Sequence, residues 1–261
     1  MFDPNDLAAR DPGLIRALLP AVRVLNRRYF RLEVSGLENV PRERAMLIAN
    51  HNGGILGPDL FCTLGSLWDC LGADAPLYAL AHDFVMRQVT GIGRAVQRLG
   101  AVRACPENAH RILEKGGLAL VYPGGDLEAY RHSSKRDAIV LGERTGFVRV
   151  AQATEAQMVP VVAHGAHRSA WIFTEGKLLA DLLALRERAR VSRFPIALAL
   201  PWGLAPGPWL PYFPLPFRIQ IKILPPVTVA AGADPVEVRR MIAAQMQQAL
   251  DSMAAASGTR R

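Results

Sequence analysis

A histidine follows a short apolar run in the first quarter of the chain. Residues 45–49 are apolar, and Asn50 and His51 come directly after them. An imidazole can serve as a general base because its unperturbed pKa lies near neutrality. A histidine at the end of a buried strand is therefore a candidate to take a proton from a substrate.

An aspartate eight positions later could orient this imidazole. The loop reads NHNGGILGPDL over residues 50–60. On an uninterrupted helix, eight residues rise about 12 Å, too far for a hydrogen bond. The glycines and the proline argue against such a helix, so the loop can fold Asp59 back toward His51. Asp59 would then fix the tautomer of His51 and stabilise its protonated form. The alternative is a structural histidine and an aspartate that only caps its helix.

A second glycine-rich loop follows another apolar run. Residues 121–131 read VYPGGDLEAYR, and consecutive glycines allow the backbone to approach a ligand closely. The alternative is a tight turn with a solvated, charged rim. The two loops give the following candidate substrate-binding residues: Asn50, Gly53, Gly54, Pro123, Gly124, Gly125, Asp126, Glu128 and Arg131. The backbone N–H groups of the glycine pairs in both loops are candidates to bind a developing oxyanion.

Apolar runs and helical patterns alternate from residue 45 onward. We expect strands at residues 45–49, 77–81, 101–102, 118–122, 158–163 and 218–224. We expect helices that begin at residue 58, at residues 83–98, 106–115, 143–155 and 174–190, and after residue 234. This order predicts an α/β fold, with a largely parallel central sheet flanked by helices. Reactive groups in such sheets collect at the carboxyl ends of the strands, where both loops lie.

The N-terminal segment predicts an amphipathic helix ahead of this domain. Apolar residues recur at helical spacing over residues 14–29, while five arginines fall on the other side. Pro20 is expected to kink or restart the helix. Such a helix either lies on a membrane surface or packs on the domain with a solvated basic face. We therefore divide the chain into a membrane-surface helix region, residues 1–35, and an α/β domain, residues 36–261.

Composition narrows the class of protein. The formal net charge is +8, which favours anionic partners. The three cysteines, Cys62, Cys70 and Cys105, show no Cys-x-x-Cys spacing, so we expect neither disulfides nor a metal site. Residues 194–217 lack charge but contain seven prolines, which excludes a membrane-spanning helix and predicts a folded loop or an interfacial surface.

Several motifs in order resemble the glycerolipid and lysophospholipid acyltransferase superfamily. The chain is most similar to the diacylglycerol-acyltransferase-like branch and its bacterial relatives. The resemblance covers residues 37–227 and includes NHNGGILGPD, GAVRACPENA, ALVYPGGDLEAYR, GERTGFVRVA, VPVVAHG and LPWGLAPGPWLPYFPLP.

The resemblance implies an acyltransferase that moves a fatty acyl group from acyl-CoA or acyl carrier protein to a lipid hydroxyl. His51 would be the general base and Asp59 its partner. No cofactor beyond the acyl thioester and no metal would be needed. We expect no nucleic-acid partner and a peripheral location on the cytoplasmic side of the inner membrane.

Two departures from the superfamily pattern bear on the substrate. Seven residues separate His51 from Asp59, where the superfamily usually has four. In the second loop, Gly124 and Leu127 stand where phosphate-using relatives carry Glu and Arg. This difference favours a neutral alcohol or a diacylglycerol-like acceptor.

Three alternatives remain open on the sequence. The first is a lysophospholipid or 1-acylglycerol-phosphate acyltransferase. The second is a lipid ester hydrolase, although the chain has no G-x-S-x-G string. The third is a non-catalytic lipid-binding module.

Overall fold

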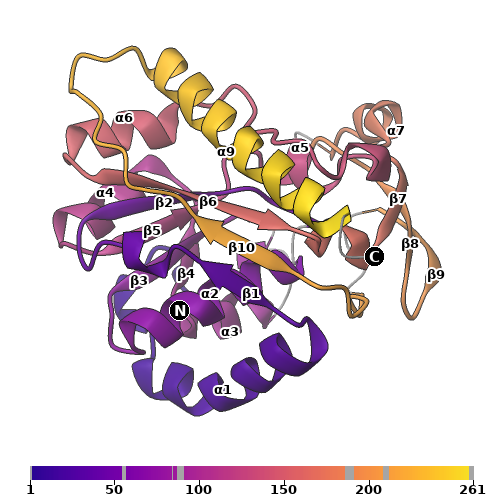
Figure 1. The fold of residues 1–261 in the computed structure, drawn as a ribbon, viewed down its shortest axis with the longest axis horizontal. Coiled ribbons are helices and arrows are strands. Elements are labelled where there is room, and N and C mark those ends of the chain that lie inside the picture. Colours follow the sequence, from indigo (N-terminus) through magenta and orange to yellow (C-terminus); the bar gives the residue numbers. More distant parts are fainter. Residues whose placement is uncertain are drawn as a thin grey trace.

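A seven-stranded sheet forms the centre of the molecule (Figure 1). The computed structural model describes residues 2–54, 57–83, 85–86, 91–185, 191–207 and 212–258. The strand order is β1-β10-β6-β2-β5-β3-β4, and all neighbours are parallel except β10 and β6. The strands are β1 (Glu33–Ser35), β2 (Ala45–Ala49), β3 (Leu77–Ala81), β4 (Ala101–Arg103), β5 (Leu118–Val121), β6 (Gln157–His164) and β10 (Gln220–Ile223). The predicted α/β fold with a largely parallel sheet is confirmed.

Helices cover both faces of this sheet (Figure 1). On one face lie α1 (Pro12–Val24) and α2 (Pro58–Leu71). On the other lie α4 (Pro106–Glu114), α6 (Gly146–Ala153) and α9 (Pro235–Gly258). Strand β2 is apolar throughout because both of its faces are buried. Leu47 packs toward the first group of helices, and Met46 and Ile48 pack toward the second. A strand that is buried on both faces needs apolar residues at every position.

The basic N-terminal helix is packed onto the domain core. Ile15 and Leu19 of α1 are buried in the same cluster as Leu47 and residues of α2. Pro20 lies within α1 and does not end it, and one π-helical turn, Leu25–Tyr29, continues it. Among the described residues, no helix is long and apolar enough to cross a membrane.

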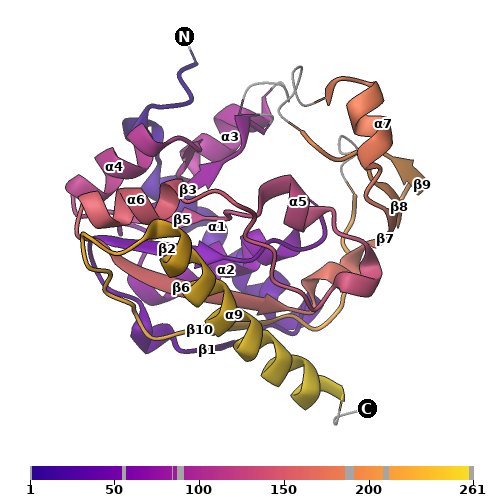
Figure 2. The same ribbon diagram turned by 90° about the horizontal axis from the view of Figure 1, so that it is seen from above.

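A second, antiparallel sheet was not predicted. It consists of β7 (Trp171–Thr174), β8 (Ile196–Ala199) and β9 (Gly203–Pro206), and Figure 2 shows it grouped with α7 (Lys177–Leu182) at one side of the molecule. The helix expected at residues 174–190 is wrong at its start, because Thr174 belongs to β7. Residues 186–190 of that prediction lie outside the described chain. The segment 194–217, expected to be a folded loop or an interfacial surface, supplies two of the three strands.

The helix expected at residues 83–98 is described only in part. Helix α3 (Ile92–Arg98) covers its end and lies next to β4, while residues 84 and 87–90 lie outside the described chain. The final helix begins as predicted, since the Asp234 carboxylate accepts a hydrogen bond from the N–H of Val236 at 3.0 Å.

Helix α9 offers a test of how the sheet is covered. Met246 is fully buried between α9 and the sheet, whereas Met241 on the same helix is exposed. Replacing Met246 with Ala should lower the free energy of unfolding by about 2–5 kcal/mol because it leaves a cavity. Met241→Ala is the matched control and should change it by less than about 0.5 kcal/mol. Urea unfolding measures both, and equal losses would contradict the packing of α9.

Candidate active site

The structure brings His51 and Asp59 together at the carboxyl end of β2. His51 follows that strand directly, and Asp59 lies in the first turn of α2. The His51 Nδ1 lies 3.1 Å from the Asp59 Oδ2, and both side chains are buried. The same oxygen accepts a hydrogen bond from the N–H of Asn52 at 3.0 Å. With Nδ1 directed at a carboxylate, Nε2 is the ring nitrogen that can exchange a proton with a substrate.

Glycines allow the loop between these two residues to fold back on itself. Gly53 and Gly54 have φ values of 72° and 95°, in the left-handed region that favours glycine. A Cβ atom at Gly57 would lie 1.9 Å from the carbonyl oxygen of Asn52 and 2.5 Å from the Asp59 Oδ1. This close approach accommodates the seven intervening residues, so the longer spacing does not prevent the pairing.

Arg131 is buried, and its guanidinium holds the histidine loop in place. All five N–H donors of its guanidinium are used. They go to the carbonyl oxygens of His51 (2.6 Å) and Glu128 (2.7 Å), to the side-chain oxygen of Asn52, and to the carbonyl oxygens of residues 135–136 (2.9 and 2.8 Å). The sequence predicted that Arg131 binds substrate. In the structure its guanidinium is instead fully occupied by groups of the protein.

The carboxylate of Glu128 holds the same loop through the backbone N–H of His51. Its carboxylate accepts one hydrogen bond from the N–H of His51 and one from the N–H of Val140, both at 2.8 Å. Burial raises the pKa of Glu128 to about 7, against the opposing effect of Arg131 and the two N–H donors. A Cβ at Gly124 would lie 2.6 Å from the Glu128 Cβ, so that glycine leaves room for the carboxylate.

The other residues of the first loop that were predicted to bind substrate, Asn50, Gly53 and Gly54, are also hydrogen-bonded within the protein. The side chain of Asn50 bonds the N–H and the carbonyl of Ala163, at 2.7 and 3.0 Å, and so joins the ends of β2 and β6. The N–H of Gly53 donates to the His167 Nδ1 at 3.2 Å, and that of Gly54 donates to the carbonyl of Ala129 at 2.9 Å. Neither N–H is directed at a substrate position.

His167 is a structural residue that the sequence did not single out. Its Nδ1 accepts from Gly53, and its Nε2 donates to the carbonyl oxygen of Arg131 at 3.0 Å. Burial lowers the pKa of His167 to about 3, so the ring stays neutral near pH 7. It joins the two loops, and no motif around it signalled this contact.

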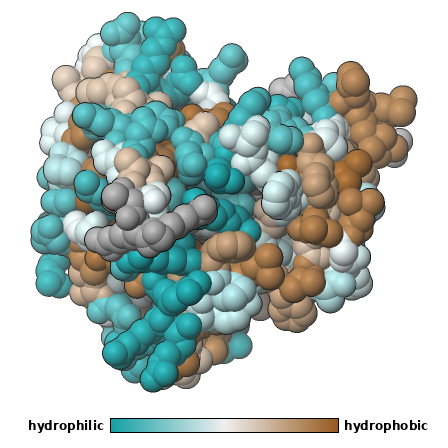
Figure 3. All heavy atoms as spheres, turned by 45° about the vertical axis from the view of Figure 1, so that its right-hand side comes forward, coloured by the Kyte–Doolittle hydropathy of each residue, from teal (hydrophilic) through white to brown (hydrophobic). Residues whose placement is uncertain are grey.

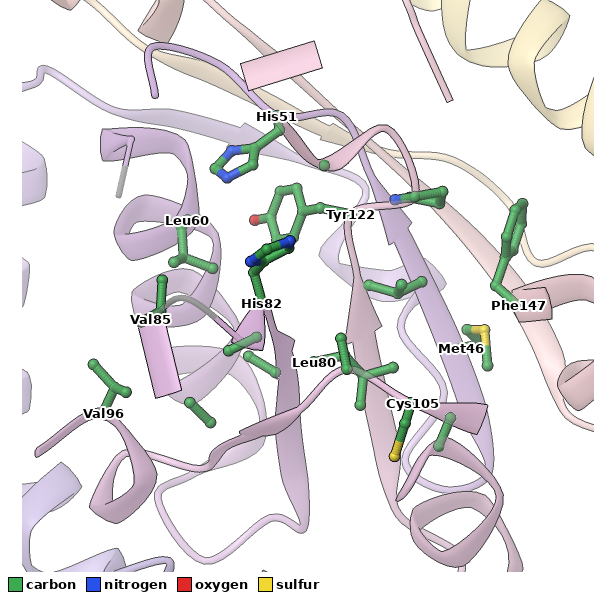
Figure 4. Close-up of a pocket in the computed structure, with 18 of the residues that line it drawn as sticks. Met46, His51, Leu60, Leu80, His82, Val85, Val96, Cys105, Tyr122 and Phe147 are labelled. Atoms are coloured by element: carbon green, nitrogen blue, oxygen red, sulfur yellow. The ribbon is translucent and has the colours of Figure 1, made fainter. Parts of the chain in front are cut away.

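A cavity of about 310 Å³ opens beside His51 (Figure 4). Of the predicted residues of the second loop, Pro123, Gly125 and Asp126 line it. Most of its wall is apolar and comes from α2, β3, α3, β4, α4 and α6, including Leu60, Leu64, Leu80, Val96, Phe147 and Val150. An apolar space of this kind, with a base at its edge, suits a substrate with a long hydrocarbon part.

Three polar residues of the cavity wall were missed by sequence reasoning. Tyr122 packs against the His51 ring with 4.7 Å between ring centroids, and His82 lies close to Tyr122 (Figure 4). Arg144 lines the cavity and is exposed. Tyr122 and His82 both stand at strand ends, which was the only available signal.

Asp126 connects the cavity wall to the chain segment that precedes β8. It is buried, and its carboxylate accepts hydrogen bonds from the N–H of Ser192 at 2.5 Å and from its hydroxyl at 2.7 Å. Gly125 donates its N–H to the carbonyl of Tyr122 at 3.1 Å. Over the ranges that the structure describes, no three His, Cys, Asp or Glu side chains converge as a metal site would require.

The neutral state of His167 predicts a pH effect on stability. The unfolded chain binds a proton near pH 6.5 and the folded chain only near pH 3, so His167 lowers stability as the pH falls through that window. The slope is about 1.4 kcal/mol per pH unit. His167→Asn keeps an acceptor for Gly53 but cannot titrate. As the pH falls from 6.5 to 4.5, the free energy of unfolding of the variant should therefore rise relative to that of the wild type.

Urea unfolding at several pH values measures this difference. Glu128 titrates in the same range with the opposite sign, but it is present in both proteins and cancels in the comparison. Parallel pH curves for the two proteins would show that His167 is not held neutral.

Sequence comparisons give relatives over most of the chain. It is 35% identical to an uncharacterized protein of Mycobacterium tuberculosis over 199 residues, which are 76% of this chain and 55% of that protein. It is 25% identical over 189 residues, 72% of this chain and 50% of the relative, to a Gallus gallus protein named DGAT1/2-independent enzyme synthesizing storage lipids. The chain thus spans about half the length of the curated relatives that it matches.

A solved structure shares the fold. The 1-acyl-sn-glycerophosphate acyltransferase PlsC of Thermotoga maritima superposes with a TM-score of 0.55, covering 91% of this chain and 80% of that one, at 18% identity. A model of the diacylglycerol acyltransferase family matches residues 14–251. The fold, the paired His51 and Asp59 and this match over nearly the whole chain lead to one conclusion: the chain belongs to the diacylglycerol acyltransferase family.

Proposed function

We propose that this chain transfers a fatty acyl group from an acyl thioester, carried on coenzyme A or acyl carrier protein, to a lipid hydroxyl. The observation that carries the proposal is the buried His51–Asp59 pair at the edge of an apolar cavity. Membership of an acyltransferase family supports the reaction class.

In the reaction, the Nε2 of His51 accepts the proton of the acceptor hydroxyl. The hydroxyl oxygen forms a bond to the thioester carbonyl carbon, and the carbonyl electrons move to oxygen. The carbonyl re-forms, the C–S bond breaks, and the leaving thiolate takes the proton from the imidazolium. General base catalysis of this kind contributes roughly 10²–10⁴-fold. Asp59 would stabilise the imidazolium, since its Oδ2 lies beside Nδ1.

The cavity is suited to hold the acyl chain. Its apolar wall begins next to His51 and includes residues of both α2 and α6. Burial of each CH₂ group contributes about 0.8 kcal/mol to binding. His51 and Asp59 could also activate water, and hydrolysis of the thioester or ester is then the competing reaction. The apolar lining beside His51 favours an acceptor that is itself a lipid.

The acceptor is a neutral alcohol or a diacylglycerol-like lipid in this proposal. A phosphate is usually held by charge-assisted bonds from Arg or Lys. Arg131, the arginine of the second loop, has all its donors occupied, and Asp126 adds a carboxylate to the cavity wall. Arg144 at the cavity is exposed and can bind a phosphate of the acyl carrier. The Gallus gallus relative is named for storage-lipid synthesis, which is compatible with a neutral acceptor.

A lipid acceptor requires access from a membrane. We propose a peripheral location, on the cytoplasmic side of the inner membrane. The net charge of +8 supports attraction to anionic head groups.

Substitution of His51 tests the base. His51→Ala should lower kcat by roughly 10²–10⁴-fold in a radiolabelled acyl-CoA assay with lipid alcohols. Asp59→Asn should lower it by roughly tenfold or more, because the imidazolium loses its counter-charge. His110→Ala, at a half-exposed histidine of α4, is the matched control and should retain wild-type activity. Circular dichroism verifies the fold of each variant. Unchanged transfer by His51→Ala would refute the mechanism.

Parallel acceptors test the neutral-alcohol proposal. At equal acyl-CoA, diacylglycerol and simple long-chain alcohols should be acylated at least roughly tenfold faster than glycerol 3-phosphate or lysophosphatidate, because no free arginine in the loop offsets the phosphate charge. Product analysis by thin-layer chromatography measures the ratio. A clear preference for a phosphorylated acceptor would assign Arg144 and its neighbours to acceptor binding instead.

A further inference from the structure

The outer face of the small antiparallel sheet is apolar. Cross-strand pairing places Trp171, Leu198 and Leu204 in one row across β7, β8 and β9. These side chains are 60%, 51% and 63% exposed. The opposite face packs inward, where Ile172 and Ala205 are buried. A sheet with one solvated face normally alternates apolar and polar residues, and this sheet does not.

The apolar surface extends beyond the sheet. Leu178 and Leu182 lie four residues apart on α7, hence on one side of the helix, and are 86% and 81% exposed. Figure 3 shows hydrophobic side chains gathered over the lobe that α7 and the small sheet form. We call this the outer apolar face: Trp171, Phe173, Leu178, Leu182, Leu198 and Leu204. Contiguous exposed apolar surface marks an interaction site.

Basic residues adjoin the same side of the molecule. The Tyr29 hydroxyl donates to the carbonyl of Pro214 at 2.8 Å, which joins the end of the N-terminal helical region to a segment with exposed apolar side chains at 213–217. Arg27 and Arg28 are exposed there and form no ion pair within the described chain. Earlier in α1, Arg16 and Arg23 instead pair with Asp74 and Asp69.

From this combination we infer that the outer apolar face enters the surface of an anionic lipid bilayer, while Arg27 and Arg28 contact its head groups. Exposed Trp and Leu side chains beside unpaired arginines are what an anionic interface attracts. A second copy of the chain is a poorer occupant, because two molecules with a net charge of +8 repel each other. The small sheet is then the element that inserts, and α1 packs onto the domain through Ile15 and Leu19.

The lobe is tied directly to the histidine loop. The hydroxyl of Tyr212 donates to the carbonyl oxygen of Gly53, and the hydroxyls of Tyr212 and Ser169 lie 3.0 Å apart. A bilayer that holds the lobe therefore also fixes the position of the His51 loop at the membrane. The inference itself does not depend on the proposed reaction, since it rests on the surface alone.

Flotation of the full chain with vesicles tests the inference. Wild type should float with phosphatidylcholine vesicles that contain phosphatidylglycerol and far less with phosphatidylcholine alone. Leu198→Ser/Leu204→Ser should lower the partition coefficient by roughly tenfold or more. The matched control, Leu18→Ser/Met241→Ser, removes two exposed apolar side chains outside the face and should stay within about twofold of wild type.

Two further arms separate the contributions. Arg27→Gln/Arg28→Gln should weaken binding to anionic vesicles only. Brominated lipids should quench wild-type tryptophan fluorescence, and Trp171→Phe should reduce the quenched fraction, a readout that does not depend on the serine variants folding. Activity measured in detergent reports the reaction separately, so a failure there leaves the flotation result unaffected.

Three results would overturn the inference. The first is no flotation of the wild type with anionic vesicles. The second is an equal loss in the control pair. The third is a dimer, detected by light scattering, that Leu198→Ser/Leu204→Ser dissociates, since the face would then cover a second copy of the chain.

Discussion

The buried guanidinium of Arg131 is the contact on which the site depends. Its five hydrogen bonds reach the carbonyl of His51, the side chain of Asn52 and the backbone of its own loop, so one side chain fixes both glycine-rich loops. Charge compensation makes this burial tolerable, because Glu128 and Asp59 lie close to it. Removing one member of such a buried set leaves an uncompensated charge, at a cost of about 3–5 kcal/mol. His51 is held by backbone contacts to charged groups, and those groups are then not free to bind a ligand.

This arrangement also explains the position of the polar network relative to the cavity. Arg131 and Glu128 bond the backbone of His51, and His167 bonds the neighbouring Gly53. The ring of His51 contacts Tyr122 and lines the apolar cavity. The hydrogen bonds from Arg131, Glu128 and His167 thus reach the backbone of the loop, while most of the cavity wall beside the His51 ring is apolar.

The sequence predicted six of the seven strands of the central sheet, all but β1, and the His51–Asp59 pair, because these depend on local patterns. An apolar strand such as β2 has to be buried on both faces, and glycines after it force a turn. It did not predict the roles of Glu128 and Arg131, since their partners come from chain segments up to 80 residues away. The second sheet was missed for a different reason. Its outer row is apolar, so the alternation that normally reveals a strand is absent, and prolines suggested a loop.

The same absence of alternation connects the fold to its surroundings. A strand whose two faces are both apolar has to be covered on both sides, and the core covers only the side of Ile172 and Ala205. In a soluble, isolated domain this leaves an unfavourable exposed surface. Lipid is a solvent in which the exposure of Trp171, Leu198 and Leu204 has no such penalty. The lobe that contains the small sheet contacts the loop that holds His51, through the hydrogen bond from Tyr212 to Gly53. In the proposed function, access to a lipid substrate and the positioning of His51 as the base are therefore properties of one connected structure.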